Sequence, residues 1–300
     1  MVFVGGLHRS GTTLVARILA EHPDAAGLVD TGVMEDEGQF LQDVYVDDAR
    51  MGTRWGRARG QTLAWSRHPL AHLTEVDARR IPDGRERLTA AWAPYWSVSG
   101  ASVLVEKTPS NIMKTRFLQE IFPDARFVVV MRNPIAQGLA VRKWAPRAMQ
   151  IGLNFHRAVA HWDRVHKSFE IDRPYLHKVF VVSHEELVAE PERVIRSLDD
   201  FCGLAPRTHS EIEVRDESRK YFDYWDTIGK GPRAVGRFEP LNPIQRRLSF
   251  IPRLLETFVA PVFGPRNHRV LAREFAAGIR ARGYDIDDHN VFPTIAQLNP

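Results

Sequence analysis

The start of the chain combines a buried strand, a glycine-containing loop and an amphipathic helix, and this combination constrains the fold more than any other feature. Residues 2–4 are apolar, the loop at 6–13 reads GLHRSGTT, and apolar residues of segment 11–21 recur on one helical face. The glycines permit a tight turn in which successive N–H groups face one concavity, and the helix N-terminus adds partial positive charge. The sequence therefore predicts a phosphate-binding loop between the first strand and the first helix.

Further short apolar runs alternate with longer amphipathic runs. Strands are expected at residues 102–105, 127–131 and 179–182. One helix is expected from Asn111, with Ser110 or Asn111 as its N-cap, and another from Pro191 to Gly203. This alternation predicts an α/β fold: a three-layer arrangement with a parallel sheet, a P-loop-like phosphate-binding loop and helices on both faces.

The remaining segments predict how this core is extended. We expect a single domain over residues 1–300, with a nucleotide-binding core at about 1–205. Segment 46–100, rich in Arg, Trp and Pro, is interpreted as a mostly helical insertion beside the site. The part from about 206 to 300 is expected to be helical near 244–259 and 267–282.

Composition excludes several classes of protein. With 44% hydrophobic and 26% charged residues in 300, the chain can build a substantial core and is not disordered. A single cysteine excludes a disulfide framework and a multi-cysteine zinc site, and no metal ion is expected. There is no apolar run of about 18 residues and no signal-like N-terminus, so a cytoplasmic protein without a transmembrane segment is predicted. A net charge of +4 without a basic stripe disfavours nucleic-acid binding.

The loop departs from the pattern of nucleoside triphosphatases at two places. Thr12 stands where those loops carry a lysine, so Arg9 is the cation inside the loop. The apolar strand at 127–131 is followed by Arg132, where a magnesium-binding aspartate is expected in an ATP-dependent enzyme. Both features argue against Mg-ATP chemistry. A small-molecule or nucleotide kinase, and a non-catalytic nucleotide-binding protein with a decayed site, remain as alternatives.

Three blocks of the sequence resemble a known family. LHRSGTTLVARIL, VEKTPSN and FVVVMRNPIAQGLAVRKW are similar, in that order, to blocks of sulfotransferases that use 3′-phosphoadenosine 5′-phosphosulfate (PAPS). The resemblance is strongest to the branch with tyrosylprotein sulfotransferases and many bacterial enzymes, and VVSHEELVAEPERVIRSLDDFCGL extends it to about residue 204. It implies a PAPS-binding α/β fold, related to nucleotide kinases, that works without a metal and transfers a sulfuryl group to a hydroxyl or, less favoured, an amine.

The resemblance also implies a set of cofactor-binding residues. They are His8, Arg9, Ser10, Gly11, Thr12, Thr13 and Arg132. Arg9 to Thr13 would hold the 5′-phosphosulfate and Arg132 the 3′-phosphate, whereas His8 fits either the phosphosulfate or the acceptor. The family carries a serine eight residues after this arginine, and here that position is Ala140.

The catalytic candidates are Lys107, Arg9, Glu37 and Glu35. By analogy with the family, Lys107 would stabilise the charge that develops on the leaving phosphate. A carboxylate in the acidic segment 30–39 would remove the proton of the acceptor; Glu37 is favoured, then Glu35, while alignment with the tyrosylprotein branch points nearer Asp30. The acceptor, whether a small molecule, carbohydrate, lipid or peptide, and the oligomeric state are not encoded in any readable motif.

Overall fold

A computed structural model describes residues 1–51, 65–144, 155–207, 209–229 and 274–300, and within them five strands form one sheet. The sheet order is β2-β3-β1-β4-β5, and every neighbouring pair is parallel. The strands are β1 Val2–Gly6, β2 Ala25–Gly27, β3 Val103–Lys107, β4 Arg126–Met131 and β5 Val179–Ser183. The predicted parallel α/β sheet is confirmed. The sequence did not reveal β2, because Ala-Ala-Gly lacks the β-branched residues typical of strands.

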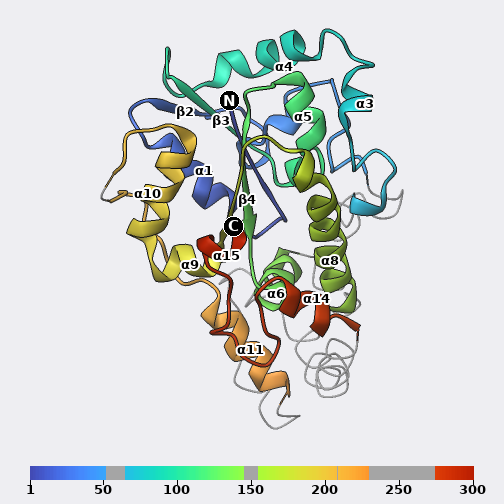
Figure 1. The fold of residues 1–300 in the computed structure, drawn as a ribbon, viewed down its shortest axis with the longest axis vertical. Coiled ribbons are helices and arrows are strands. Elements are labelled where there is room, and N and C mark those ends of the chain that lie inside the picture. The colour runs from blue at the N-terminus through green and yellow to red at the C-terminus, as the bar shows by residue number, and fades with distance from the viewer. Residues whose placement is uncertain (52–64, 145–154, 208, 230–273) are drawn as a thin grey trace, which may run out of the picture. The chain divides into compact units, whose positions relative to one another are not determined.

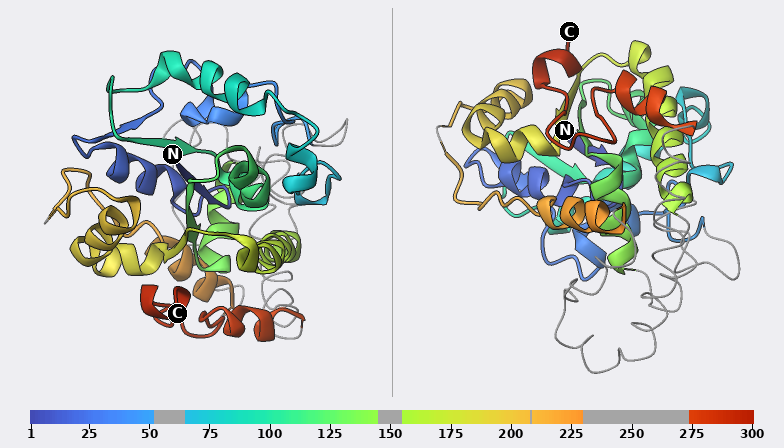
Figure 2. Two further views of the ribbon diagram at one scale, coloured as in Figure 1. Left: turned by 45° about the horizontal axis from the view of Figure 1, so that its top comes forward. Right: turned by 90° about the horizontal axis from the view of Figure 1, so that it is seen from below.

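Helices cover both faces of the sheet, so the predicted three layers are confirmed (Figures 1 and 2). On one face, α1 (Thr12–Ala20) and α10 (Pro191–Cys202) pack against the valines of the strands. On the other, α4 (Gly84–Trp92) and α5 (Thr115–Ile121) pack around Phe3 and Phe127, whose rings stack with centroids 5.8 Å apart. Alternate strand residues thus feed two cores, as the pleat of a strand requires.

The other helical elements of the described residues comprise short segments and three longer helices. The short ones are η1 Met34–Asp36, η2 Gly38–Phe40, η3 Trp65–Arg67, α3 Glu75–Ala78, η4 Ala93–Tyr95, η5 Pro109–Met113, η6 Arg173–Tyr175, α9 His184–Ala189, α14 Ala276–Ala281 and α15 Ile295–Leu298. The longer ones are α6 Pro134–Trp144, α8 Phe155–Asp172 and α11 Arg219–Gly229. The helix expected at 244–259 lies outside the described residues, and α14 lies in the described part of 267–282.

The helix expected from Asn111 begins later, and its predicted N-cap is wrong. A 3₁₀ segment, η5, comes first, and α5 starts at Thr115. Both predicted caps lie in η5, at least four residues before Thr115, where the Asn111 amide donates to Glu106 at 2.6 Å and the Ser110 hydroxyl donates to Gln39 at 3.1 Å. Tertiary hydrogen bonds have displaced the local capping preference.

The chain divides into two compact units. The first comprises residues 1–132, 164–215 and 292–300 and contains the whole sheet. The second comprises 133–163 and 216–291; within it the Trp162 and Tyr284 rings meet edge to face, and Arg282 pairs with Asp163 at 2.9 Å. None of the described helices has the length and apolar character needed to cross a membrane.

Candidate active site

The carboxyl ends of the central strands bring the predicted site residues to one edge of the sheet. Val4 of β1 lies opposite Lys107, the last residue of β3, and Gly6 lies opposite Val130 of β4. The loop after β1 and Arg132 after β4 therefore leave the sheet beside Lys107. In parallel α/β sheets this edge is where ligands bind.

The loop between β1 and α1 has the shape of an anion cradle. Arg9 has a φ of +68° and Gly11 a φ of +106°, so two residues of the loop have left-handed backbone conformations before the helix begins at Thr12. The Ser10 hydroxyl is buried and has no hydrogen-bond partner among the described residues. A buried hydroxyl at a helix N-terminus fits a phosphate or sulfate oxygen, which would satisfy it. Arg9 itself is exposed on this loop.

Arg132 and His184 flank the same loop. Arg132 is buried, and its Nη1 donates to the Arg9 carbonyl at 2.8 Å. The His184 ring packs on Gly11 so closely that a Cβ there would lie 2.7 Å from His184 Cδ2. Burial and the neighbouring Arg132 charge hold the pKa of His184 well below its usual value, so this ring is neutral. Sequence reasoning missed His184, although it directly follows β5 as Arg132 follows β4.

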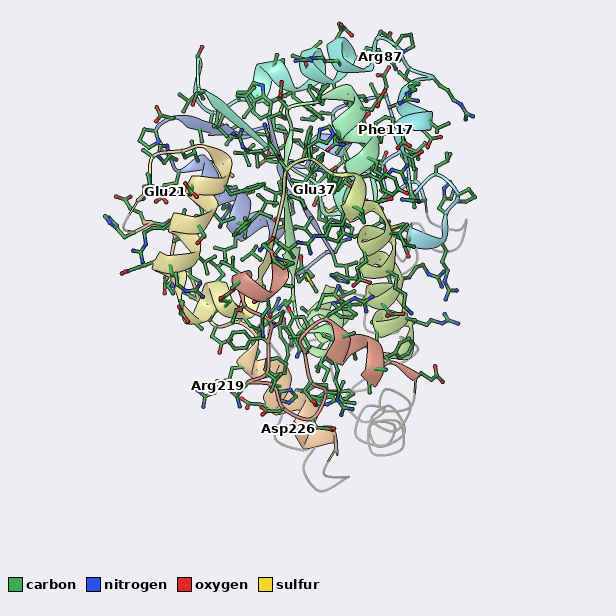
Figure 3. The ribbon with its side chains drawn as sticks, viewed as in Figure 1. Glu21, Glu37, Arg87, Phe117, Arg219 and Asp226 are labelled. Carbon is green, nitrogen blue, oxygen red and sulfur yellow. The ribbon has the colours of Figure 1, made fainter. Side chains whose placement is uncertain are left out.

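The structure brings Lys107 and Glu37 together. Lys107 Nζ donates to Glu37 Oε1 at 3.3 Å and to the Glu35 carbonyl at 2.7 Å, and the Lys107 and Glu37 side chains are each 6% exposed. Gln39 Nε2 donates to the other Glu37 oxygen at 2.6 Å. Burial raises the pKa of Glu37, and the Lys107 and His8 charges offset only part of that rise. Figure 3 marks Glu37 among the packed side chains near the middle of the ribbon. A carboxylate with a raised pKa is suited to accept a proton.

The other two candidate bases point elsewhere. Glu35 is exposed, and its carboxylate lies 3.5 Å from the Thr13 hydroxyl in the first turn of α1. Asp30 is also exposed. Positive φ angles at Glu35 and Asp36 turn the chain so that the carboxylate of Glu37, and not that of Glu35, faces Lys107. Glu35 contacts Lys107 through its backbone carbonyl only.

Glu106 fixes the segment that carries Glu37. This carboxylate is fully buried and accepts hydrogen bonds from the Gly38 amide at 3.0 Å, from Thr108 at 2.6 Å and from Asn111 at 2.6 Å. Through these contacts Glu106 orients the backbone next to Glu37. Ser183 likewise has a structural role, since its hydroxyl accepts from the Glu186 amide and caps α9. Ala140 is buried in α6.

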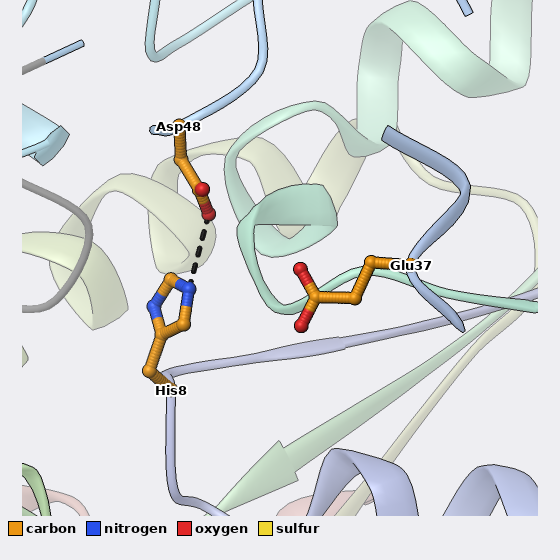
Figure 4. A group of neighbouring side chains, drawn as sticks. All are labelled: His8, Glu37 and Asp48. Atoms are coloured by element: carbon orange, nitrogen blue, oxygen red, sulfur yellow. Dashed lines mark ion pairs between the residues drawn. The ribbon is translucent and has the colours of Figure 1, made fainter. Parts of the chain in front are cut away.

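His8 faces two acids. Its Nε2 lies 3.1 Å from Asp48 Oδ2, and the Glu37 carboxylate faces the same pair (Figure 4). A ring nitrogen of His8 and one carboxylate oxygen each of Glu37 and Asp48 all lie within 4.8 Å of one another. The His8 side chain is thus placed beside the candidate base.

Comparison with known proteins assigns the sequence to a family. The model of the sulfotransferase family matches residues 2–208. The chain belongs to the sulfotransferase family. The predicted resemblance is confirmed, and the kinase alternative is not favoured, in agreement with the missing loop lysine. This match covers the sheet, the phosphate-binding loop, Glu37, Lys107 and Arg132.

Individual relatives are more distant. The nodulation protein NoeE of Sinorhizobium fredii is 30% identical over 142 residues, which are 45% of this chain and 29% of NoeE. Protein-tyrosine sulfotransferase 1 of Danio rerio is 24% identical over 213 residues, 68% of this chain and 53% of that protein. The chain thus spans about half or less of the length of these curated relatives. A sulfotransferase structure from Alicyclobacillus acidocaldarius aligns with a TM-score of 0.44 and 18% identity over 79% of this chain and 92% of that one.

Proposed function

We propose that this sulfotransferase moves the sulfuryl group of PAPS to an acceptor hydroxyl and releases adenosine 3′,5′-bisphosphate. The observation that carries the proposal is the buried contact between Lys107 and Glu37, 3.3 Å apart, beside a phosphate-binding loop. An ammonium and a carboxylate at one point supply the two groups that in-line transfer needs: a cation for the leaving phosphate and a base for the acceptor.

The residues divide the work as follows. The amides of residues 9–13 and the Ser10 hydroxyl would bind the phosphosulfate, and Arg132, which already contacts the loop, would bind a phosphate of the same nucleotide. Glu37 takes the proton of the substrate hydroxyl as the oxygen of that hydroxyl bonds to sulfur. Lys107 stabilises the oxygen of the leaving phosphate as its bond to sulfur breaks. The products are a sulfate ester, adenosine 3′,5′-bisphosphate and a proton.

The direct test uses sulfur-labelled PAPS with a panel of a phenol, a sugar, a lipid alcohol and a tyrosine peptide. The peptide belongs in the panel because relatives of this chain are named protein-tyrosine sulfotransferases. We expect labelled product together with adenosine 3′,5′-bisphosphate in equal amounts. Binding of the bisphosphate without transfer to any acceptor would instead favour a non-catalytic nucleotide-binding protein, and Mg-ATP turnover would favour a kinase.

Two substitutions test the assigned roles. Glu37→Gln and Lys107→Ala are each expected to lower kcat by about 10²-fold or more, since each removes a group that acts in the transition state. Glu35→Gln is the matched control for the base, because Glu35 is two residues away and exposed, and it should keep most of the activity. Equal loss in Glu35→Gln and Glu37→Gln would contradict the assignment of the base.

A further inference from the structure

We propose that His8, held by Asp48, is a positioning residue that keeps a second positive charge beside Glu37 and so keeps the base ionised when Lys107 turns to the leaving group. This inference rests on the proposed function, because it concerns the same base. It assigns a role to Asp48 and to the His8 side chain, which the proposed transfer itself does not use.

His8, Glu37 and Asp48 form a compact cluster. Asp48 is fully buried, and its Oδ2 lies 3.1 Å from His8 Nε2. Figure 4 shows the Glu37 carboxylate turned toward this pair. One nitrogen or oxygen atom from each of the three side chains lies within 4.8 Å of the other two. The buried Trp65 ring meets the His8 imidazole edge to face, with centroids 6.2 Å apart, and so helps to fix the ring plane.

The proposed reaction requires Lys107 to contact two different groups. Its ammonium contacts Glu37 now, yet it must contact the leaving phosphate during transfer. When it moves, Glu37 would be left buried next to the Asp48 anion, and two buried carboxylates at this distance do not both stay ionised without a cation. A protonated His8, close to both carboxylates, supplies that cation without moving.

The surroundings favour the protonated form of His8. Burial and the Lys107 charge lower the pKa of His8. The negative charges of Asp48 and Glu37 and the hydrogen bond to Asp48 raise it by more, so the pKa of His8 is raised overall. Asp48 in turn is kept ionised: burial raises its pKa, yet His8, Gln39 and the Lys114 charge bring the net shift down.

A divalent metal ion is the competing occupant of the same three side chains. An imidazole and two carboxylates form a plausible ligand set. Lys107, however, places an ammonium 3.3 Å from Glu37 Oε1, and at equal distance it repels a divalent ion twice as strongly as it repels the single charge of a protonated His8. The observed cluster therefore fits a proton on His8 better than a metal ion.

The first test measures His8 directly and needs no turnover. Histidine ring signals are followed by NMR against pH in the full-length protein, and the His8 signal is identified by its loss in His8→Gln. We expect His8 to titrate above the usual histidine range and Asp48→Asn to bring it down by about one unit or more. Asp47→Asn is the matched control, because Asp47 pairs instead with the exposed Arg50 at 3.0 Å. A His8 that titrates normally in the wild type overturns the proposal, whether or not an acceptor is sulfated.

The second test is the pH dependence of kcat. Without His8, Glu37 lies beside Asp48 with no imidazolium nearby, so Glu37 becomes protonated at a higher pH. The low-pH limb of the kcat profile (the acid limb) should therefore shift to higher pH by about one unit in His8→Gln. The double variant His8→Gln with Asp48→Asn removes the anion as well and should move the limb back.

Three outcomes would contradict the role of His8. They are an unmoved acid limb in His8→Gln, no return of the limb in the double variant, and calorimetric Zn²⁺ binding that Asp48→Asn abolishes. The last of these would show a metal site instead of a proton site. If His8 titrates as expected but no acceptor in the panel is sulfated, the proposed function fails while the charge cluster stands.

Discussion

Glu106 takes no part in the proposed chemistry, yet at the scale of single residues it decides where Glu37 lies. Its buried carboxylate accepts the Gly38 amide at 3.0 Å, and the Trp92 indole donates to the Gly38 carbonyl at 3.1 Å. A Cβ on Gly38 would lie only 2.6 Å from Glu106 Oε1. Glycine is therefore required at this position by close approach and not by backbone conformation.

Gly38→Ala should displace Glu37 from Lys107. We expect kcat to fall by at least about tenfold and the free energy of unfolding by about 1–3 kcal/mol, because the added methyl group overpacks a buried site. Gly100→Ala serves as the control: no atom lies within 4 Å of its Cβ position, and its φ of +78° costs stability through the backbone alone. Similar activity loss in both variants would mean that general destabilisation, and not the position of Glu37, is responsible.

Lys114 illustrates the cost of a buried charge. It is fully buried, donates to the Ser110 hydroxyl at 3.0 Å and lies over the Tyr45 ring. Burial lowers the pKa of Lys114 to about 8, although Asp48 and Glu106 oppose the shift. The folded protein therefore releases this proton more readily than the unfolded chain does.

This difference predicts a pH dependence of stability. Between about pH 8 and 10.5 the unfolded state holds more protons on Lys114 than the folded state, so this group makes the free energy of unfolding rise with pH. Relative to Lys114→Met, the wild type should gain about 1 kcal/mol per pH unit in that window, as measured by urea unfolding. If the free energy of unfolding depends on pH in the same way in both proteins, burial does not lower the pKa of Lys114.

At the scale of elements, the edge strand β5 is protected by the segment around α15. The Asn299 amide accepts from the Val181 N–H and donates to the Val181 carbonyl, both at 2.8 Å, as a neighbouring strand would. The Glu186 carboxylate accepts from the Ile295 amide at 2.6 Å and holds the start of α15. An exposed strand edge is a site of aggregation, so this contact closes a weak point of the sheet.

Asn299→Ala should remove that protection. We expect the free energy of unfolding to fall by about 1–3 kcal/mol, since buried backbone groups of Val181 lose their partner, and aggregation on heating to increase. Activity per folded molecule should not change. Asn290→Ala, at an exposed position that bonds only to Asp288 among the described residues, is the control and should be neutral.

Elements were predictable where local signals and packing agreed. Helix α10 begins at Pro191 and ends at Gly203 in the left-handed conformation, as the sequence indicated. The N-cap of α5 was predicted wrongly, because Ser110 and Asn111 lie in the preceding segment η5, where both side chains donate to residues outside the helix. Local signals fail where a side chain has a stronger tertiary partner.

At the scale of the sheet-containing unit, the proposed nucleotide site is distributed over several strand ends. Its loop follows β1, Lys107 ends β3, Arg132 follows β4 and His184 follows β5. Any ligand held by these groups must stabilise the folded arrangement of the strands, since the site does not exist in the unfolded chain.

Adenosine 3′,5′-bisphosphate should therefore protect the protein from unfolding, by about 2.7 kcal/mol at a concentration of 100 times Kd. Arg132→Ala should raise Kd by about tenfold or more and remove a corresponding part of this protection, as measured by calorimetry and thermal unfolding. Arg79→Ala, whose exposed side chain bonds to Glu120 at 2.9 Å, is the control and should behave as the wild type. Unchanged affinity in Arg132→Ala would remove its assigned role.

The loop between the first strand and the first helix, the alternation of strands and helices apart from β2, and the resemblance to the sulfotransferase family were predictable from the sequence alone. These depend on residues close together in the chain, where periodicity, glycine spacing and motif order are direct physical signals. Only the tertiary structure decided which acid meets Lys107, and it alone brought Asp48 to His8 and His184 to Gly11. These contacts join residues tens of positions or more apart, through backbone turns at Glu35 and Asp36 and through packing across strands, and neither leaves a local pattern in the sequence.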